Sequence, residues 1–392
     1  MIRSRWLVTA SLSLFLLAGC SAPATAPEQA AAGCVPGAGD PPTTDVPFSH
    51  ATNVEITGGD GYRVLSVRQP YPGGTAQSVV LLGCEQDAPA LPADLAGAPV
   101  LRTPVDGIFA YSTTQLPMIT ELDVLDRLTG VGSLDLISDP AVRAHVESGG
   151  AVEFGRNFAI DAERVVAEDP PVLLTGGEDD PALPALATAG IPVVGWADYL
   201  ETGPLGQAEW IKVMGALTGR DDEAAAVFDG IEQRYTELAE RVRGAEPTPI
   251  VAGQPYQGSW PVPAGDSTAG ILFSDAGATW SGAGARSTGR MPQTLESVLA
   301  EDGDARIWLA DGPWETTADI AATDPRLTSV AAAGPDGQVW TRDRFLGPTG
   351  GNQIYERGVL HPDEILADLV AILHPDLLPG HEFVYYRQVP AG

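Results

Sequence analysis

One long amphipathic segment near the middle of the chain restricts the fold more than any other feature. From Ala224 to Val242 apolar residues recur at steps of three and four, which predicts a single helix of roughly 20 residues. Such a helix is about 30 Å long, because each residue adds about 1.5 Å. Three acidic residues, 221–223, suit its amino end, and Gly244 follows its last turn. The helix therefore divides the chain and limits how its two halves can move.

On both sides of this helix, short apolar runs alternate with helical segments, a pattern that favours parallel sheets covered by helices. We expect strands at Gly107–Tyr111, Leu134–Ile137, Val172–Leu174, Val193–Trp196, Ile250–Gly253, Arg306–Ala310 and Val339–Trp340. We expect helices near Leu116–Asp126, Ala141–Glu147, Ala162–Ala167, Ala182–Ala189, 204–218, Ala269–Ala276, Leu295–Ala300 and Pro362–Leu373. The sequence thus predicts an α/β protein with two lobes, each a mainly parallel sheet flanked by helices, and a ligand cleft between the lobes.

Two eight-residue segments match each other across the long helix. Residues 162–169 and 295–302 both read x-Glu-x-Val-apolar-Ala-Glu-Asp, and each comes shortly before a predicted strand. One copy on each side of the central helix favours two lobes of like architecture. Before them, Tyr62–Val67 and Ser78–Leu82 predict a hairpin that turns at Pro72-Gly73-Gly74.

The amino terminus has the features of a secretory signal. Arg3 and Arg5 precede an apolar run from Trp6 to Leu17, which is shorter than the roughly 20 residues that span a bilayer. The following Leu17-Ala18-Gly19-Cys20 resembles the bacterial lipobox, in which the cysteine carries lipid. We therefore expect an exported lipoprotein, anchored through Cys20 to the outer face of the cell membrane.

These features suggest a division of the chain into a signal peptide, a lipidated flexible tether rich in Ala, Pro, Gly and Thr, and a folded body. The expected boundaries are 1–19 for the signal, 20–44 for the tether, 45–203 for the N-terminal lobe, 204–244 for the helical connector and 245–392 for the C-terminal lobe. In an oxidising compartment the two remaining cysteines, Cys34 and Cys84, are expected to form a structural disulfide.

The formal net charge of −30 argues against a nucleic-acid partner, because phosphate binding depends on Lys and Arg. It also argues against adhesion to anionic lipid by charge, so the lipid anchor would hold the protein at the membrane. We expect a monomer.

Two further segments, Leu205-Gly-Gln-Ala-Glu-Trp-Ile-Lys212 and Arg357-Gly-Val-Leu-His-Pro-Asp-Glu-Ile-Leu366, resemble substrate-binding lipoproteins of ABC importers. The resemblance runs from about residue 100 to 373. It is to the class III type, whose lobes are joined by one rigid helix and whose members bind ferric siderophores, haem or vitamin B12. It implies a non-catalytic protein that delivers an iron chelate to an ABC permease and its ATPase, with no cofactor besides that ligand.

In this family a glutamate on one exposed helix of each lobe docks to arginines of the permease. By position, Glu163 and Glu296 match these glutamates. Two exposed carboxylates, one on each lobe, can form charge-assisted pairs with arginines. The permease could then sense how the two lobes are arranged.

The ligand is expected outside the carboxyl ends of the strands, between the lobes. Aromatic residues in polar loops suit a flat or greasy chelate, and arginines suit its negative charge. The candidates in the N-terminal lobe are Tyr111, Ser112, Thr113, Thr114, Trp196 and Tyr199. Those in the C-terminal lobe are Tyr256, Trp260, Trp280, Arg286, Arg290, Trp314, Arg342 and Arg344.

Other functions stay open at this stage. Haem or a corrinoid could replace the siderophore, and a surface lipoprotein could bind another protein. A divalent-metal receptor needs converging ligands, and the five histidines form no ligand-spaced cluster. An exported serine hydrolase would use Ser267, but no apolar strand comes immediately before it, and we expect Ser267 to cap the helix near Ala269.

Overall fold

The computed structural model describes residues 33–391 apart from 36, 38–41, 88 and 157–158. The expected signal peptide, Cys20 and most of the tether lie outside these residues. Cys34 and Cys84 form the expected disulfide, with their Cα atoms 5.8 Å apart. No helix in the described part of the chain is long and apolar enough to cross a membrane.

The N-terminal lobe is built on a five-stranded sheet in which all neighbouring strands are parallel, in the order β11-β10-β5-β6-β7. Its strands are β5 (Ile108–Ala110), β6 (Leu128–Val131), β7 (Val152–Glu153), β10 (Leu173–Leu174) and β11 (Val193–Val194). The helices that follow these strands are α1 (Leu116–Glu121), α2 (Pro140–Glu147), α3 (Ala162–Glu168) and α4 (Leu183–Ala189). The predicted alternation of strands and helices is confirmed in this lobe.

The C-terminal lobe repeats this plan with a second five-stranded sheet, ordered β14-β12-β16-β17-β18, in which only β18 is antiparallel to its neighbour. Its strands are β12 (Thr248–Ala252), β14 (Ala278–Thr279), β16 (Ile307–Ala310), β17 (Gln338–Thr341) and β18 (Arg387–Gln388). Its helices are α8 (Thr268–Asp275), α9 (Leu295–Glu301), α10 (Thr317–Thr323), α11 (Arg357–Leu360) and α12 (Pro362–Leu373). β13 (Trp260–Pro263) and β15 (Arg290–Gln293) form a separate two-stranded antiparallel sheet in this lobe, with α8 and β14 between them in the chain.

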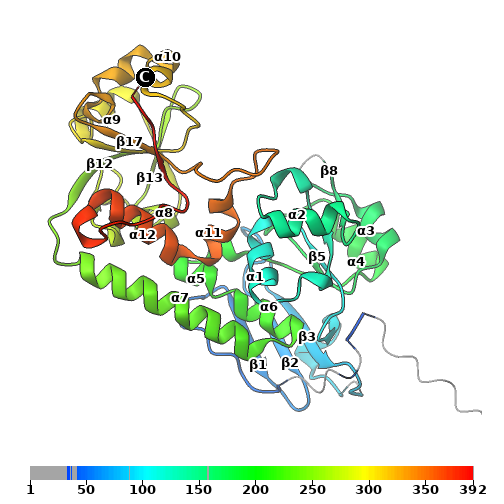
Figure 1. The fold of residues 1–392 in the computed structure, drawn as a ribbon. Coiled ribbons are helices and arrows are strands. Elements are labelled where there is room, and N and C mark those ends of the chain that lie inside the picture. The colour runs from blue at the N-terminus through cyan, green and yellow to red at the C-terminus, as the bar shows by residue number, and fades with distance from the viewer. Residues whose placement is uncertain (1–32, 36, 38–41, 88, 157–158, 392) are drawn as a thin grey trace, which may run out of the picture.

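The long helix joins the lobes as predicted. α7 (Asp221–Val242) has 22 residues and runs beneath both lobes (Figure 1). Its buried face includes Phe228, Ile231 and Tyr235, and it packs against α6 (Ile211–Thr218) and α12. The short helix α5 (Pro204–Ala208) precedes α6. Because α7 is buried along one face, we expect it to restrict the lobes to small relative movements.

A four-stranded sheet of β1 (Val54–Gly58), β2 (Arg63–Val67), β3 (Gln77–Gly83) and β4 (Val100–Thr103) precedes the five-stranded sheet in the chain. β2 and β3 form the predicted antiparallel hairpin.

One predicted strand is wrong. Leu134–Leu136 is a turn of 3-10 helix, and the strand before it is β6. β6 contains Thr129 and Gly130, which weaken its apolar signal. A Cβ atom at Gly130 would lie 2.5 Å from Cδ1 of Phe109, so glycine is required where β6 packs against β5.

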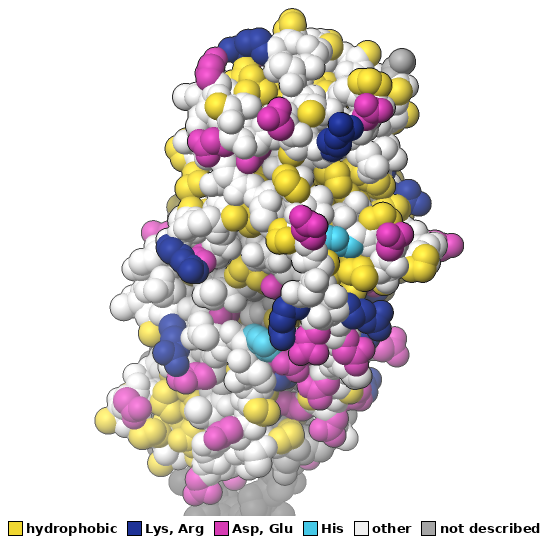
Figure 2. Space-filling model, turned by 90° about the vertical axis from the view of Figure 1, so that its left-hand side faces the viewer, with side chains coloured by type: hydrophobic (Ala, Val, Ile, Leu, Met, Phe, Trp, Pro, Cys, Tyr) yellow, Lys and Arg dark blue, Asp and Glu magenta, His cyan; other side chains and the backbone are white. Residues whose placement is uncertain are grey.

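The surface agrees with the net charge. In the view of Figure 2, acidic side chains lie over much of the molecule, with Lys and Arg side chains interspersed and hydrophobic side chains scattered. This mixture resembles an ordinary solvated protein face.

Candidate functional site

A cavity of about 450 Å³ lies at the carboxyl ends of β5, β6 and β10 in the N-terminal lobe. Tyr111, Ser112 and Thr113, all predicted ligand residues, line it together with Ser133 and the exposed Leu136. Gly132, Gly155, Gly176 and the carboxylate-bearing Glu178 complete the lining. Three of the residues predicted from their position after a strand therefore lie together around one cavity.

The loop after β5 is held rigidly by its own hydrogen bonds. Ser112 Oγ accepts from Thr114 N at 3.3 Å, and the buried Gln115 donates from Nε2 to the carbonyl of Thr175 at 2.6 Å. Burial raises the pKa of the Tyr111 hydroxyl, and the carboxylates of Asp180 and Glu178 raise it further. Tyr111 therefore stays protonated and can donate to a ligand, within a negative local field.

The opposite lobe presents charge at the matching strand ends. Asp311 directly follows β16 and Arg342 directly follows β17, while Arg290 opens β15. The Asp311 carboxylate pairs with Arg290 at 2.6 Å and with Arg342 at 2.8 Å. Burial alone would lower the pKa of Arg342, but the Asp311 carboxylate together with Tyr355 and Tyr386 outweighs it, so that the pKa is raised. The arginine is therefore cationic and half-buried at this site.

A segment from the C-terminal lobe connects the two sets of strand ends. We call residues 343–356 the crossing segment. Within it, the exposed ring of Tyr355 lies 5.0 Å from Cζ of Arg342. The carbonyl of Tyr355 accepts from Thr113 Oγ1 at 3.4 Å. The arginines of one lobe and the hydroxyl-lined cavity of the other are thus linked through a single residue.

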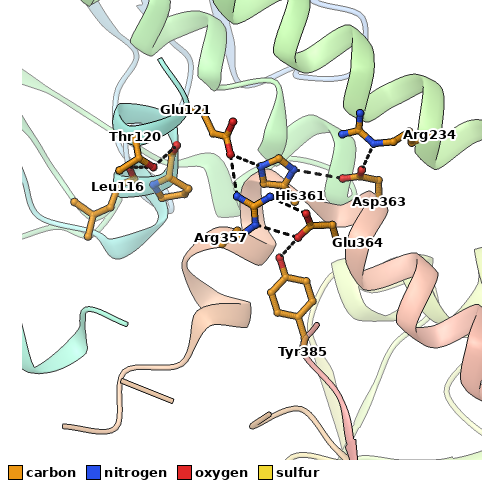
Figure 3. A network of polar contacts seen from close by, with 10 residues as sticks. Leu116, Thr120, Glu121, Arg234, Arg357, His361, Asp363, Glu364 and Tyr385 are labelled. Carbon is orange, nitrogen blue, oxygen red and sulfur yellow. Dashed lines mark hydrogen bonds and ion pairs between the residues drawn. The ribbon is translucent and has the colours of Figure 1, made fainter. Parts of the chain in front are cut away.

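The crossing segment leads into a polar network between the lobes (Figure 3). Arg357 of α11 lies between Glu121 of α1 at 2.8 Å and Glu364 of α12 at 2.7 Å. His361 adds a second contact to Glu121, at 3.2 Å. Asp363 pairs with Arg234 of the long helix at 2.6 Å. These contacts tie α1, α7 and α12 together close to the hinge.

The four tryptophans predicted as ligand residues lie in the core instead. The indole nitrogens of three donate to neighbouring groups: Trp260 to Ala252 O at 3.0 Å, Trp280 to Pro263 O at 2.7 Å and Trp314 to Thr323 Oγ1 at 3.2 Å. Trp196 is fully buried, with its ring 5.1 Å from that of Trp210. These side chains are buried and offer almost no surface to a ligand in this conformation. They contribute instead to the packing of the core.

The remaining predicted residues are exposed but scattered. Tyr256 is 63% exposed in the loop after β12, and Tyr199 donates to Gly177 O at 2.8 Å. Arg286 pairs with Asp266 at 3.1 Å while its side chain stays almost fully in solvent. Arg344 is exposed, and its amide donates to Tyr385 O. None of them is among the residues that line the cavity in the N-terminal lobe.

Ser267 caps α8 as expected: its Oγ accepts from Gly270 N at 3.0 Å and donates to Ala264 O at 2.7 Å. Within the described residues, no three His, Cys, Asp or Glu side chains are grouped so that they could hold a metal ion.

Glu163 and Glu296 occupy equivalent positions in the two lobes. Each is the second residue of a seven-residue helix, α3 or α9, and each is exposed. The helices are capped alike, by Asp161 accepting from Arg164 N and by Thr294 accepting from Ser297 N. Glu296 also pairs with Arg326 at 3.0 Å. The repeat seen in the sequence is therefore a repeat in structure.

Five residues of the site besides glycines were not predicted: Ser133, Leu136, Glu178, Asp311 and Tyr355. Asp311 directly follows the carboxyl end of a predicted strand, and that position could have identified it as a candidate. Leu136 lies in the predicted strand Leu134–Ile137, where the structure has a turn of 3-10 helix. Tyr355 could not have been found, since only the path of the crossing segment brings it to Arg342.

Comparison with known proteins agrees with this architecture. Residues 108–341 match the periplasmic binding protein family. An uncharacterized lipoprotein of Methanocaldococcus jannaschii is 21% identical over 301 residues, covering 74% of this chain and 70% of that protein.

Solved structures share the fold. A periplasmic haem-binding protein of Pseudomonas aeruginosa has 21% identity and a TM-score of 0.53, covering 72% of this chain and 98% of that one. The triscatecholate siderophore-binding protein FeuA of Bacillus subtilis has 15% identity and a TM-score of 0.52, covering 69% and 94%. Because the family match spans more than half of the sequence, this chain belongs to the periplasmic binding protein family.

Proposed function

We propose that the protein captures a ferric chelate of the siderophore type outside the cytoplasm and delivers it to an ABC importer. One observation carries the proposal: Arg290 and Arg342 meet at Asp311 beside the strand ends of one lobe, and Tyr355 links Arg342 to Thr113 of the hydroxyl-lined cavity in the other. Arginines can bind the anionic oxygens of a chelate, and the hydroxyls can bind its neutral groups. The site binds and orients its ligand and performs no chemistry on it.

The export signal, the lipid on Cys20 and the permease are parts of the same proposal. A tether between the lipid and the folded body would keep the binding site within reach of a membrane permease. Glu163 and Glu296 would contact that permease, one from each lobe, as charged residues on exposed helix ends. Two of the solved relatives bind haem or a ferric siderophore by name, and both ligand classes belong in the test.

The test is a titration of the full-length protein in mild detergent, followed by its tryptophan fluorescence. The probes are a ferric trihydroxamate, a ferric triscatecholate, haemin and cobalamin. We expect saturable quenching by a ferric siderophore. Arg290→Gln and Tyr111→Phe should each weaken binding roughly tenfold, the loss of about 1.4 kcal/mol.

Arg306→Gln is the matched control, because Arg306 is a surface arginine immediately before β16, at the opposite end of that strand from Asp311. It should leave the titration unchanged. Saturation by haemin or cobalamin alone would replace the siderophore with that ligand. A flat response to all four probes would contradict the proposal.

A further inference from the structure

Asp311 is an internal counter-ion placed where the ligand's anionic group would bind. Each of its carboxylate oxygens pairs with a different arginine, Oδ2 with Arg290 and Oδ1 with Arg342. An anionic ligand must therefore share these guanidinium groups with Asp311. The cluster carries two positive charges and one negative charge, so its net attraction for an anion is that of one arginine.

The side chains of Arg290, Asp311 and Arg342 are held by further contacts, so this balance of charges is built into the site. Arg342 is the more enclosed arginine, with 17% of its side chain exposed, and the ring of Tyr355 lies over its guanidinium. Arg290 also donates to Pro261 O at 3.4 Å. The Asp311 carboxylate is 26% exposed, and moving it away would cost both arginines a close partner.

The opposite lobe adds negative charge. Glu178 lines the cavity beside Tyr111 and is exposed. Asp180, two residues later, is buried and accepts from Ile160 N at 2.9 Å and Ala182 N at 2.8 Å. Two carboxylates thus lie near the hydroxyls that would receive the ligand, and no arginine or lysine is among the residues that line this cavity.

We propose that Asp311 and Glu178, one carboxylate from each lobe, select a chelate of low net charge, such as an electroneutral ferric trihydroxamate, against a ferric triscatecholate with its threefold negative charge. This inference rests on the proposed capture of a ferric chelate. Like charges brought together in a partly desolvated site cost several kcal/mol. The low-charge chelate avoids that cost, so its binding depends little on either carboxylate.

The experiment compares both ferric chelates on the full-length protein in detergent, for the wild type, Asp311→Asn and Glu178→Gln. The wild type should bind the trihydroxamate more tightly. Each variant should strengthen triscatecholate binding by at least roughly tenfold while changing trihydroxamate binding little. Glu178→Gln keeps the test sound if Asp311→Asn does not fold, because the Glu178 side chain is exposed and the thermal melt should be unchanged.

Asp336→Asn is the matched control. Asp336 pairs with Arg306 at 3.7 Å on the surface before β17, so the variant removes the same charge far from the strand ends. Tighter wild-type binding of the triscatecholate, or equal shifts in Asp336→Asn and the site variants, would overturn the inference and leave the proposed function standing. Failure of both chelates to bind the wild type would remove the proposed function and the inference with it.

Discussion

The carboxylate of Glu356 is buried against Ser138, which belongs to the opposite lobe. It accepts from Ser138 N at 2.7 Å, from Ser138 Oγ at 2.5 Å and from Asp139 N at 3.2 Å. Burial raises the pKa of Glu356, although the Ser138 donors oppose that shift. The end of the crossing segment is therefore fastened to the amino end of α2.

Glu356→Ala should loosen this fastening. It leaves three buried donors unpaired, and each such loss costs about 1–3 kcal/mol when water cannot replace the partner. We expect a loss of about 2–3 kcal/mol in the free energy of unfolding and faster hydrogen exchange in residues 134–139 and 343–356. Urea unfolding and exchange mass spectrometry measure both. Glu315→Ala, which alters an 82% exposed side chain, should change neither, and equal effects of the two variants would contradict the prediction.

The hinge network should make the protein sensitive to acid. A hydrogen bond from His361 lowers the pKa of Glu121 from 4.5 to about 2, and Arg357 adds to this effect while burial opposes it. A lowered carboxyl pKa means that the stabilisation is complete above pH 4.5 and is lost as the pH falls from 4.5 towards 2. Allowing for solvent screening, Glu121 contributes roughly 2 kcal/mol.

Glu121→Gln therefore should lower stability at pH 7 and flatten its decline between pH 4.5 and pH 2. Chemical unfolding across that range provides the measurement. Glu147→Gln on α2 is the control, since Glu147 is a largely exposed residue paired with Arg143. If Glu121→Gln declined with pH as steeply as the wild type, Glu121 would not be the group responsible.

Much of the fold could be predicted from the sequence, because its signals are local. The periodicity of 224–242 gave the hinge helix, and the Glu-helix repeat gave equivalent helices before β10 and β16. β6 was missed because two of its four residues are Thr129 and Gly130. Short strands with little apolar content become visible only when their partners in the sheet are known.

The site could be predicted only in part, for a different reason. Tyr111, Ser112 and Thr113 could be predicted from their position at the carboxyl end of a strand, because that prediction requires only the location and direction of the strand. Tryptophans in polar, glycine-rich loops predict ligand contacts, but whether such a side chain is buried depends on pairing with residues distant in the sequence. Trp260 is buried because β13 pairs with β15, opposite Gln293, and nothing near Trp260 in the sequence indicates that pairing.

This placement of Trp260 can be tested against its exposed neighbour. Trp260 is fully buried and its ring lies 5.4 Å from that of Trp308, so Trp260→Ala should cost about 3–5 kcal/mol in the free energy of unfolding. Tyr256→Ala, at an exposed position, should stay within about 0.5 kcal/mol of the wild type. Urea unfolding measures the stability of both variants. A small effect of Trp260→Ala would contradict the burial of Trp260 and make it a candidate ligand contact again.

Glu163 and Glu296 yield the last prediction, because each comes with a matched control on its own helix. α3 and α9 each end in a second exposed glutamate, Glu168 and Glu301. If the first-turn glutamates dock to the permease, Glu163→Ala and Glu296→Ala should each lower cellular uptake of an iron-55 chelate by roughly tenfold.

Chelate binding to the purified variants should stay unchanged, since neither glutamate lies at the strand ends. Glu168→Ala and Glu301→Ala remove the same charge about one and a half turns further along each helix and should leave uptake intact. Equal loss of uptake in all four variants would indicate an effect of overall charge, and normal uptake in the first two would exclude these residues as docking contacts. Only a loss confined to Glu163 and Glu296 supports recognition of both lobes at once.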